Sequence, residues 1–247
     1  MTFARDLDFS GKTVLVTGAA NGFGAATSKL LFEHGARLVL ADREEESLNR
    51  IARELNATAH VYEQSDPASI QRLASAVGEI DILINNAGIL VAKPLLETSI
   101  EDIQQLINVD FVGAAVMMKL IGAGMVKRQR GVVLSIGSQT AFCGGENRAI
   151  YAAAKAAISQ LTRSLAVEWG SSGVRVVCLA PGRALTRMTM TSTALPGSTL
   201  DRGLSRVPLG RWGTPEEIAK MIVFLVSDAA SYVTGETVIA DGGYVLG

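Results

Sequence analysis

Histidine and cysteine are scarce in this chain of 247 residues, which contains two of each. His34 falls in the first predicted helix and His60 near the third predicted strand, so we expect neither a histidine-based catalytic triad nor a histidine zinc site. We expect no bound metal. Cys143 and Cys178 are too few for a disulfide scaffold and fit a reducing compartment, which points to a cytoplasmic protein.

Positive and negative side chains are nearly equal in number, and the chain lacks long apolar runs. The chain has 23 Lys and Arg against 24 Asp and Glu, a formal net charge of −1, so nothing indicates nucleic acid or an anionic membrane surface as a partner. No stretch reaches about 18 uninterrupted apolar residues, so we expect no membrane span. Aromatic residues make up only 5% within a hydrophobic content of 48%. This composition fits a parallel sheet that helices rich in alanine and leucine bury on both faces.

Glycines gather where the first apolar run of the chain meets a helix. Gly18 would allow a sharp exit from the strand, Gly22 the approach of backbone N–H groups to a pyrophosphate, and Gly24 close packing of the helix on the sheet. A second apolar run, 37–41, ends in Asp42, where dinucleotide folds place the acid that holds the adenosine ribose hydroxyls. The spacing predicts a mononucleotide-binding half, and a flexible glycine loop in an ordinary α/β domain is the alternative.

Apolar strands alternate with helical patterns throughout the chain, without a repeat, a low-complexity segment or a linker-like change of composition. Strands are expected at 12–17, 37–41, 59–62, 80–84, 132–136, 174–179 and 236–240. Helices are expected from Gly24 onward, at 44–55, 67–77, 100–127 and 150–169, and from a capping box at Thr214 to Glu217 through Leu225. We predict one α/β domain over residues 1–247, with a doubly wound, Rossmann-type, seven-stranded parallel sheet and helices on both faces.

Residues 186–206 form the least periodic stretch of the chain. They are rich in threonine and serine and contain Pro196 and Gly197. We expect this segment to be a flap that is mobile without ligand and orders over the site when ligands bind.

The sharpest chemical pattern is Tyr151 followed four residues later by Lys155, a spacing that puts both side chains on one face of a helix. An ammonium ~6 Å from a phenol at an effective dielectric of ~20 contributes ~3 kcal/mol, or ~2 pK units, which brings the phenol into range for proton transfer. Ser138 follows the fifth strand and can donate to the same substrate oxygen. The alternatives are a loop cap for Ser138, a half-buried ring for Tyr151 and a solvated cation for Lys155.

Several motifs now stand together. They are Thr17-Gly18-x-x-x-Gly22-x-Gly24, Asn85-Asn86-Ala87-Gly88, Asn108, Ser138, Tyr151-x-x-x-Lys155, Pro181-Gly182 and Asp241-Gly242-Gly243. Over nearly the whole chain they resemble the classical short-chain dehydrogenase/reductase family. The resemblance implies Tyr151 as acid/base, Lys155 as the residue that lowers its pKa and holds the nicotinamide ribose, Ser138 as positioning the substrate oxygen, and Asn108 as supporting a proton-relay water.

The expected cofactor-binding residues combine the glycine-rich turn with positions that the resemblance adds. They are Gly18, Asn21, Gly22, Phe23, Gly24, Asp42, Arg43, Asp66, Asn86, Ala87, Gly88, Tyr151, Lys155, Pro181, Gly182 and Thr186. In the resembled family an acid at the place of Asp66 contacts the adenine amino group, whereas Asp66 read locally is the N-cap of the next helix. Both interpretations stay open. Phe23 and Cys178 depart from the residues commoner at their positions.

The cofactor is predicted to be NAD rather than NADP. Asp42 would accept from both ribose hydroxyls yet repel a 2′-phosphate, and Asn21 supplies no cation to offset it. Arg43 complicates this preference because it can swing toward a phosphate. Arg183, directly after Pro181-Gly182, either meets an acidic substrate or pairs with a surface acid, and we favour the surface pair.

We therefore predict an oxidoreductase that moves a hydride between a nicotinamide cofactor and a secondary alcohol or ketone. The alternatives are a 3-oxoacyl carrier-protein reductase, which usually uses NADPH, and a non-catalytic dinucleotide sensor, which would not need the set Ser138, Tyr151 and Lys155. The family resemblance, the apolar helix 218–226 and the last strand lead us to expect a homotetramer.

Overall fold

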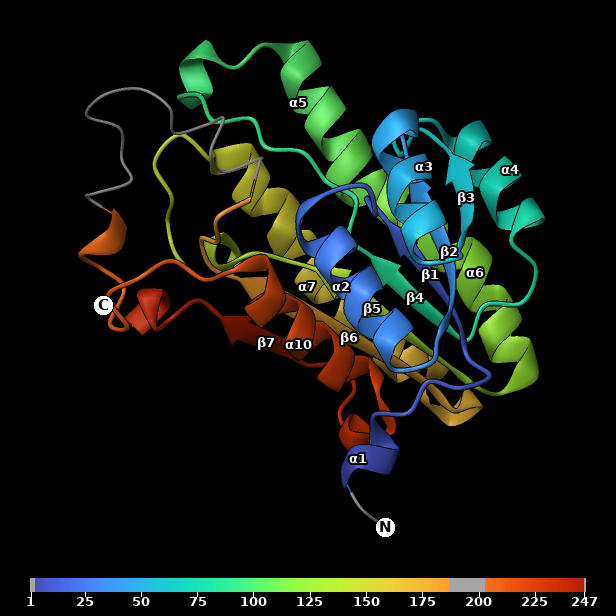
Figure 1. The fold of residues 1–247 in the computed structure, drawn as a ribbon. Coiled ribbons are helices and arrows are strands. Elements are labelled where there is room, and N and C mark those ends of the chain that lie inside the picture. Colours follow the sequence, from blue (N-terminus) through green and yellow to red (C-terminus); the bar gives the residue numbers. More distant parts are fainter. Residues whose placement is uncertain (1–2, 187–202, 247) are drawn as a thin grey trace.

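A computed structural model describes residues 3–186 and 203–246 of the chain. Within these residues seven parallel strands form one sheet, with helices on both of its faces (Figure 1). The strand order is β3-β2-β1-β4-β5-β6-β7, so the order reverses between β1 and β4. This is the predicted doubly wound arrangement, in which ligands bind outside the carboxyl ends of the strands near the reversal.

The strands lie close to the predicted apolar runs. They are β1 (Thr13–Thr17), β2 (Arg37–Asp42), β3 (Thr58–Val61), β4 (Ile82–Asn85), β5 (Gly131–Ile136), β6 (Val174–Pro181) and β7 (Thr237–Ala240). Val14, Leu15 and Val16 of β1 are all fully buried. Because consecutive side chains of a strand point to opposite faces, both faces of the sheet are covered at β1.

Apart from the first one, which was not predicted, the helices follow the predicted order. They are α1 (Phe3–Asp6), α2 (Gly22–Glu33), α3 (Glu45–Glu54), α4 (Pro67–Ala76), α5 (Ile100–Ile107), α6 (Ala114–Arg128), α7 (Ala149–Trp169) and α10 (Pro215–Val226). Helices α5 and α6 share the region predicted as one helix. Short 3₁₀ turns occur at Leu95–Glu97, Gln139–Ala141, Gly170–Ser172, Asp228–Ala230 and Tyr244–Leu246.

The hydrophobic core has two layers, one on each side of the sheet. Leu31 of α2 packs in one layer with Val14 and Val16, together with apolar residues of α3 and α10. Met117 of α6 packs in the other layer with Leu15, together with residues of α4 and α7. Each layer removes an apolar face of the sheet from water, and this burial provides the main driving force for the fold.

The helical region expected at 100–127 is not one regular α-helix. A π-helical turn at Asn108–Gly113 separates α5 from α6. Gly113 lies so close to the Gln64 carbonyl oxygen that a Cβ atom would overlap it. A π-helical turn is wider than an α-helical one and changes which side chains face inward. Val109 and Asp110 are buried, whereas Asn108 is exposed.

The segment Ile100–Arg128 is long and apolar enough to cross a membrane by length and composition alone. In this fold 50% of its most apolar window is buried. Met117, Met118 and Met125 pack against the sheet in the second core layer. Burial within the chain therefore accounts for its apolar character.

The predicted capping box opens α10. The Thr214 hydroxyl accepts from the Glu217 N–H at 3.2 Å, and the Glu217 carboxylate accepts from the Thr214 N–H at 3.0 Å. Arg211 donates two hydrogen bonds to the same carboxylate, at 2.6 and 2.8 Å. The Arg211 guanidinium and the Thr214 backbone hold the pKa of Glu217 at about 2, below its ordinary value of 4.5.

Replacing Glu217→Gln should lower the melting temperature at neutral pH because the ion pair with Arg211 is lost. Since the folded-state pKa of Glu217 is depressed to about 2, its stabilising contribution is fully present above pH 4.5 and disappears as the pH falls through about 2. Thermal unfolding followed by circular dichroism should show the gap between wild type and variant closing over that range.

Glu216→Gln is the matched control, because Glu216 is an exposed acid in the same helical turn. It should change the melting temperature less than Glu217→Gln does. A gap between Glu217→Gln and wild type that stays constant from pH 7 to pH 2 would contradict the assignment.

Candidate active site

A cavity of about 540 Å³ runs along the carboxyl ends of the strands. Its size lies within the ~300–1,000 Å³ typical of small-molecule and cofactor sites. The predicted site residues that line it are Gly18, Asn21, Gly22, Phe23, Asp42, Arg43, Asn86, Ala87, Gly88, Ser138, Tyr151, Lys155, Pro181, Gly182 and Thr186. Gly24, Asp66 and Asn108 do not line it. Of the predicted flap, residues 187–202 lie outside the described residues.

The N-terminus of α2 opens into this cavity. Asn21, the N-cap residue, makes no side-chain cap and donates instead to the Glu44 carboxylate at 3.1 Å. The first-turn N–H groups of α2 therefore have no capping acceptor and are available to an anion. Gly22 has a φ of +55°, and the nearest side chain to a Cβ built on it is Thr186 at 3.7 Å. This open, N–H-lined surface fits the pyrophosphate of a dinucleotide.

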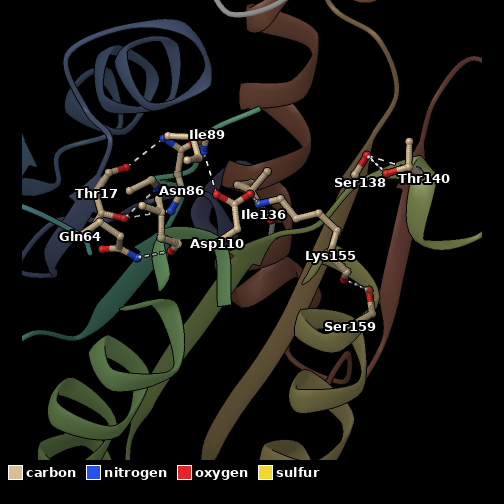
Figure 2. A network of polar contacts seen from close by, with 12 residues as sticks. Thr17, Gln64, Asn86, Ile89, Asp110, Ile136, Ser138, Thr140, Lys155 and Ser159 are labelled. Atoms are coloured by element: carbon tan, nitrogen blue, oxygen red, sulfur yellow. Dashed lines mark hydrogen bonds and ion pairs between the residues drawn. The ribbon is translucent and has the colours of Figure 1, made fainter. Parts of the chain in front are cut away.

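Gly24 acts through packing and not through the cavity wall. A Cβ atom there would overlap the Gly18 carbonyl oxygen and lie 2.8 Å from the Asn86 amide nitrogen. That amide donates to the Thr17 and Gly18 carbonyl oxygens, at 2.9 and 3.0 Å (Figure 2). The Thr17 hydroxyl oxygen in turn accepts from the Asn86 and Ala87 N–H groups. The Asn-Asn-Ala-Gly segment thus ties the end of β4 to the end of β1.

Acidic residues line the cavity where β2 and β3 end. The Asp42 carboxylate accepts from the Ala20 N–H and the Glu44 N–H, both at 2.9 Å, and these bonds fix its orientation. Glu44 and Glu63 line the same end of the cavity, and Arg43 is the basic residue among them. An acid held in this way suits neutral hydroxyl donors such as those of a ribose.

Asp66 is the N-cap of α4, which is one of the two interpretations of the sequence. Its carboxylate accepts from the Ala68 N–H at 2.9 Å and lies 3.6 Å from Arg72. The structure thus shows the N-cap role, and Asp66 does not line the cavity, so the adenine contact stays a prediction. Gln64, two residues earlier, lines the cavity instead.

Ser138, Tyr151 and Lys155 meet at the end of the cavity next to β5 and β6. The Ser138 hydroxyl oxygen accepts from the Thr140 N–H at 3.2 Å and from the Thr140 hydroxyl at 2.9 Å (Figure 2). Its own O–H is thereby left to donate to a ligand. The Lys155 ammonium lies 5.6 Å from the centre of the Tyr151 ring, as the i, i+4 spacing predicts.

Lys155 is almost completely buried, with 5% of its surface exposed. Its ammonium donates to the Ile136 carbonyl oxygen at 3.1 Å and lies 3.1 Å from the Asp110 carboxylate (Figure 2). Burial by itself lowers the pKa of Lys155, but the charges of Asp110 and Tyr151 outweigh it and hold the pKa above its ordinary value of 10.5. The side chain keeps its proton at neutral pH.

Asn108 does not take the place that the resemblance implies for it. It is exposed at the start of the π-helical turn, whereas Asp110 is 1% exposed and lines the cavity. Asp110 also accepts from the Ile89 N–H at 2.7 Å. The wide turn brings residue 110, and not residue 108, to the inner face. The sequence did contain a signal for Asp110, because an acid between Val109 and Phe111 is unusual in an apolar helical stretch.

The comparisons with known proteins agree with this fold. A family model described as enoyl-(acyl carrier protein) reductase matches residues 18–245. A solved structure described as a short chain dehydrogenase/reductase family protein matches with a TM-score of 0.90 at 33% identity, covering 96% of this chain and 99% of that one. This chain belongs to the classical short-chain dehydrogenase/reductase family.

Relatives of this short-chain dehydrogenase/reductase have varied names. The 3-oxoacyl-(acyl-carrier-protein) reductase of Thermotoga maritima is 36% identical, covering 96% of this chain and 98% of that protein. The cis-4-hydroxycyclohexanecarboxylate dehydrogenase of Sinomonas cyclohexanicum is 38% identical, with coverages of 96% and 97%. The galactitol 2-dehydrogenase of Cereibacter sphaeroides is 37% identical, with 100% of both chains covered. The family consists of oxidoreductases that use nicotinamide cofactors.

Several residues of the short-chain dehydrogenase/reductase site were not anticipated from the sequence. The cavity is also lined by Glu44, Glu63, Gln64, Asp110, Gln139 and Arg148. Most of them follow the end of a strand or sit in a helical turn, and Arg148 is the N-cap residue of α7. Among the described residues, no group of three or more His, Cys, Asp or Glu could hold a metal ion.

Removing one partner of the buried pair should destabilise the protein strongly. Asp110→Ala leaves the Lys155 ammonium buried without its carboxylate, and a loss of about 3–5 kcal/mol is expected. Lys155→Met leaves the Asp110 carboxylate buried without the ammonium that pairs with it. In urea unfolding the double variant should lose less than the sum of the single variants. Because the pKa of Lys155 is raised, its contribution is full below pH 10.5 and is lost as the pH rises through the folded-state pKa.

Lys93→Ala is the control, because Lys93 pairs with Asp102 at 2.6 Å on the surface. Lys93→Ala should lower the free energy of unfolding much less, since exposed ion pairs contribute little to stability. Additive losses for Asp110→Ala and Lys155→Met would show that the two buried groups do not interact as the geometry indicates.

Proposed function

We propose that this chain is a cytoplasmic, NAD-dependent dehydrogenase that interconverts a secondary alcohol and a ketone. One observation carries the proposal. Ser138, Tyr151 and Lys155 line one end of a cavity whose other parts are an uncapped helix N-terminus and the oriented Asp42 carboxylate. The arrangement joins a dinucleotide site to a proton-transfer site.

The side chains divide the chemistry between them. When bound, the nicotinamide cofactor accepts or supplies the hydride. Ser138 donates its O–H to the substrate oxygen and positions it. Tyr151 takes the proton from the alcohol during oxidation and returns it to the carbonyl oxygen during reduction.

Lys155 supplies a fixed positive charge beside Tyr151. It attracts the negative charge that develops on the phenol oxygen as the proton leaves. Asp110 holds the ammonium in place and keeps it protonated. A Cβ atom on Gly88 would lie 3.3 Å from the Lys155 ammonium and 3.4 Å from Asp110, so a side chain there would press against this ion pair.

The cofactor preference is supported by the charges where β2 and β3 end. Asp42, Glu44 and Glu63 line this end of the cavity, and Arg43 opposes them. A 2′-phosphate would bring two further negative charges beside these acids, whereas ribose hydroxyls can donate to them. A structural neighbour, 34% identical, is described as a putative NAD(P) dependent gluconate 5-dehydrogenase from Beutenbergia cavernae with bound NADP.

NADH should bind more tightly than NADPH by at least about tenfold, the factor that corresponds to 1.4 kcal/mol of charge repulsion. Titration followed by nicotinamide fluorescence measures both dissociation constants. Asp42→Ala should reduce the preference, and Glu45→Ala, an exposed acid of α3, should not. Tighter binding of NADPH by the unmodified protein would refute the NAD preference.

A 3-oxoacyl carrier-protein reductase is the alternative within the family, and the Thermotoga maritima relative bears that name. Turnover of acyl thioesters with NADPH would favour it, and turnover of free alcohols with NAD favours our proposal. A non-catalytic dinucleotide sensor is the second alternative. It has no use for a buried, ion-paired lysine beside a tyrosine in the same cavity.

We also propose a homotetramer, although the structure removes one reason for it. Ile218, Ile222 and Val223 of α10 are buried in the chain's own core, so this apolar face is not left for another subunit. Apolar side chains that remain exposed near the last strand are Leu209, Ile239 and Leu246. They offer surface for association.

Tyr151→Phe should abolish turnover, with a loss of at least ~10²–10⁴ in kcat, because it removes the phenol that we propose as the group that transfers the substrate proton. NAD affinity should stay nearly unchanged, since the ring remains. Lys155→Ala should weaken cofactor binding as well. Steady-state rates and cofactor titrations measure the two effects separately.

Tyr232→Phe removes a fully exposed hydroxyl and is the matched control. It should retain wild-type rates. Full activity of Tyr151→Phe on the best substrate found would disprove the mechanism even though the fold is right.

A further inference from the structure

Two arginines line the cavity at its catalytic end. Arg148 directly precedes α7 and stands three residues before Tyr151. Arg183 follows Pro181 and Gly182 after β6. The fold thus brings two guanidinium groups from separate segments to the cavity that holds Ser138.

Most of the described acids that line the cavity lie away from these two arginines. Asp42, Glu44 and Glu63 follow β2 and β3, which the sheet order separates from β5 and β6 by β1 and β4. Asp110, the remaining acid among the described lining residues, lies against Lys155. Among the described lining residues, the catalytic end of the cavity therefore holds two arginines and no acid apart from Asp110.

The two guanidinium groups lie close enough to influence each other. Burial, and next to it the positive charge of Arg148, lowers the pKa of Arg183. Arg183 stacks on Trp212, with 5.3 Å between the guanidinium carbon and the ring centre, which restrains its direction. Within residues 3–186 and 203–246 the Arg148 guanidinium makes no hydrogen bond or ion pair. Two neighbouring cations repel, and a shared anion relieves the repulsion.

Gln139 adds a polar group at the same place. It is 3% exposed, and its Oε1 atom has no hydrogen-bond partner within the described part of the chain. A Cβ atom on Gly182 would lie 2.9 Å from that oxygen, so the amide sits beside the segment that carries Arg183. A buried acceptor without a donor favours a ligand that carries a donor, such as the hydroxyl group of an alcohol.

We propose that the substrate is a secondary alcohol or ketone that also carries a carboxylate, which Arg148 binds with Arg183 adding positive charge. The inference rests on the proposed dehydrogenase function. Guanidinium groups bind carboxylates through paired, charge-assisted hydrogen bonds, so they select for charge and for position. Ser138 and Tyr151 then hold the reacting oxygen while the carboxylate sets the orientation of the molecule. From the sequence we favoured a surface acid as the partner of Arg183, and here Arg183 is assigned only a supporting positive charge beside Arg148.

The test measures the turnover of secondary alcohols with NAD. Each alcohol is tested in two forms, one that carries a carboxylate and one that carries an uncharged amide in its place. Suitable pairs are lactate and lactamide, 3-hydroxybutyrate and 3-hydroxybutyramide, and 4-hydroxycyclohexanecarboxylate and its amide. For the best pair, kcat/KM should be at least about tenfold higher for the carboxylate. Arg148→Gln should bring the carboxylate-to-amide ratio close to one, and Arg148→Lys should give an intermediate ratio because it keeps the charge without the planar fork.

Arg163→Gln is the control, since Arg163 is an exposed arginine of the same helix that does not line the cavity. It should leave the ratio unchanged. Affinity for NADH, measured by fluorescence, should be unchanged in Arg148→Gln. If that variant weakens NADH binding as much as it lowers kcat/KM for the carboxylate, Arg148 binds the cofactor and the proposal is overturned.

Failure of this inference differs from failure of the dehydrogenase function. Efficient turnover of alcohols with a carboxylate-to-amide ratio near one refutes the carboxylate and leaves the dehydrogenase in place. If no alcohol or ketone is turned over with either cofactor, the proposed function fails. Calorimetry with cyclohexanecarboxylate and cyclohexanecarboxamide, added to the complex with NADH, then still tests the arginines: equal affinities for both probes overturn the proposal.

Discussion

The buried ammonium of Lys155 joins segments that lie far apart in the sequence. Its own helix, α7, is linked to the end of β5 through the Ile136 carbonyl oxygen and to the π-helical turn through Asp110 (Figure 2). Asp110 in turn binds the loop after β4 through the Ile89 N–H. A buried charge is tolerated only with such partners. The same ammonium lies beside Tyr151, so the packing of this region and its proton chemistry depend on one ion pair.

The parallel sheet converts chain order into an arrangement of charge. All carboxyl ends meet at one edge, where acids follow β2 and β3, an uncapped helix N-terminus follows β1, and arginines lie next to β5 and β6. In the function that we propose, a ligand pair along this edge meets hydroxyl acceptors first, then N–H groups that suit an anion, then the proton-transfer residues with arginines nearby. This order of environments suits a dinucleotide followed by an alcohol that carries a carboxylate.

Errors in the sequence-based site had physical causes. Asn108 and Asp110 are two residues apart in one apolar helical stretch, and the spacing of apolar residues alone does not reveal a π-helical turn. Asp66 is equally suited to cap its helix and to reach a ligand, and only the direction of its side chain decides between them. Arg148 has no local signal at all, because its role depends on Arg183, a residue 35 positions away in the printed sequence.

The sequence by itself determined the seven strands, most helices, the capping box at Thr214, the glycine-rich turn and the pairing of Tyr151 with Lys155. Each of these depends on residues within a few positions of one another, where backbone geometry and apolar periodicity act directly. Only the tertiary structure decided that Asp110 holds Lys155, that Glu63 lines the same cavity as Asp42, and that Arg148 and Arg183 line the end of the cavity that holds Ser138. Those contacts depend on strand order and on one widened helical turn, which bring distant charges within interacting range.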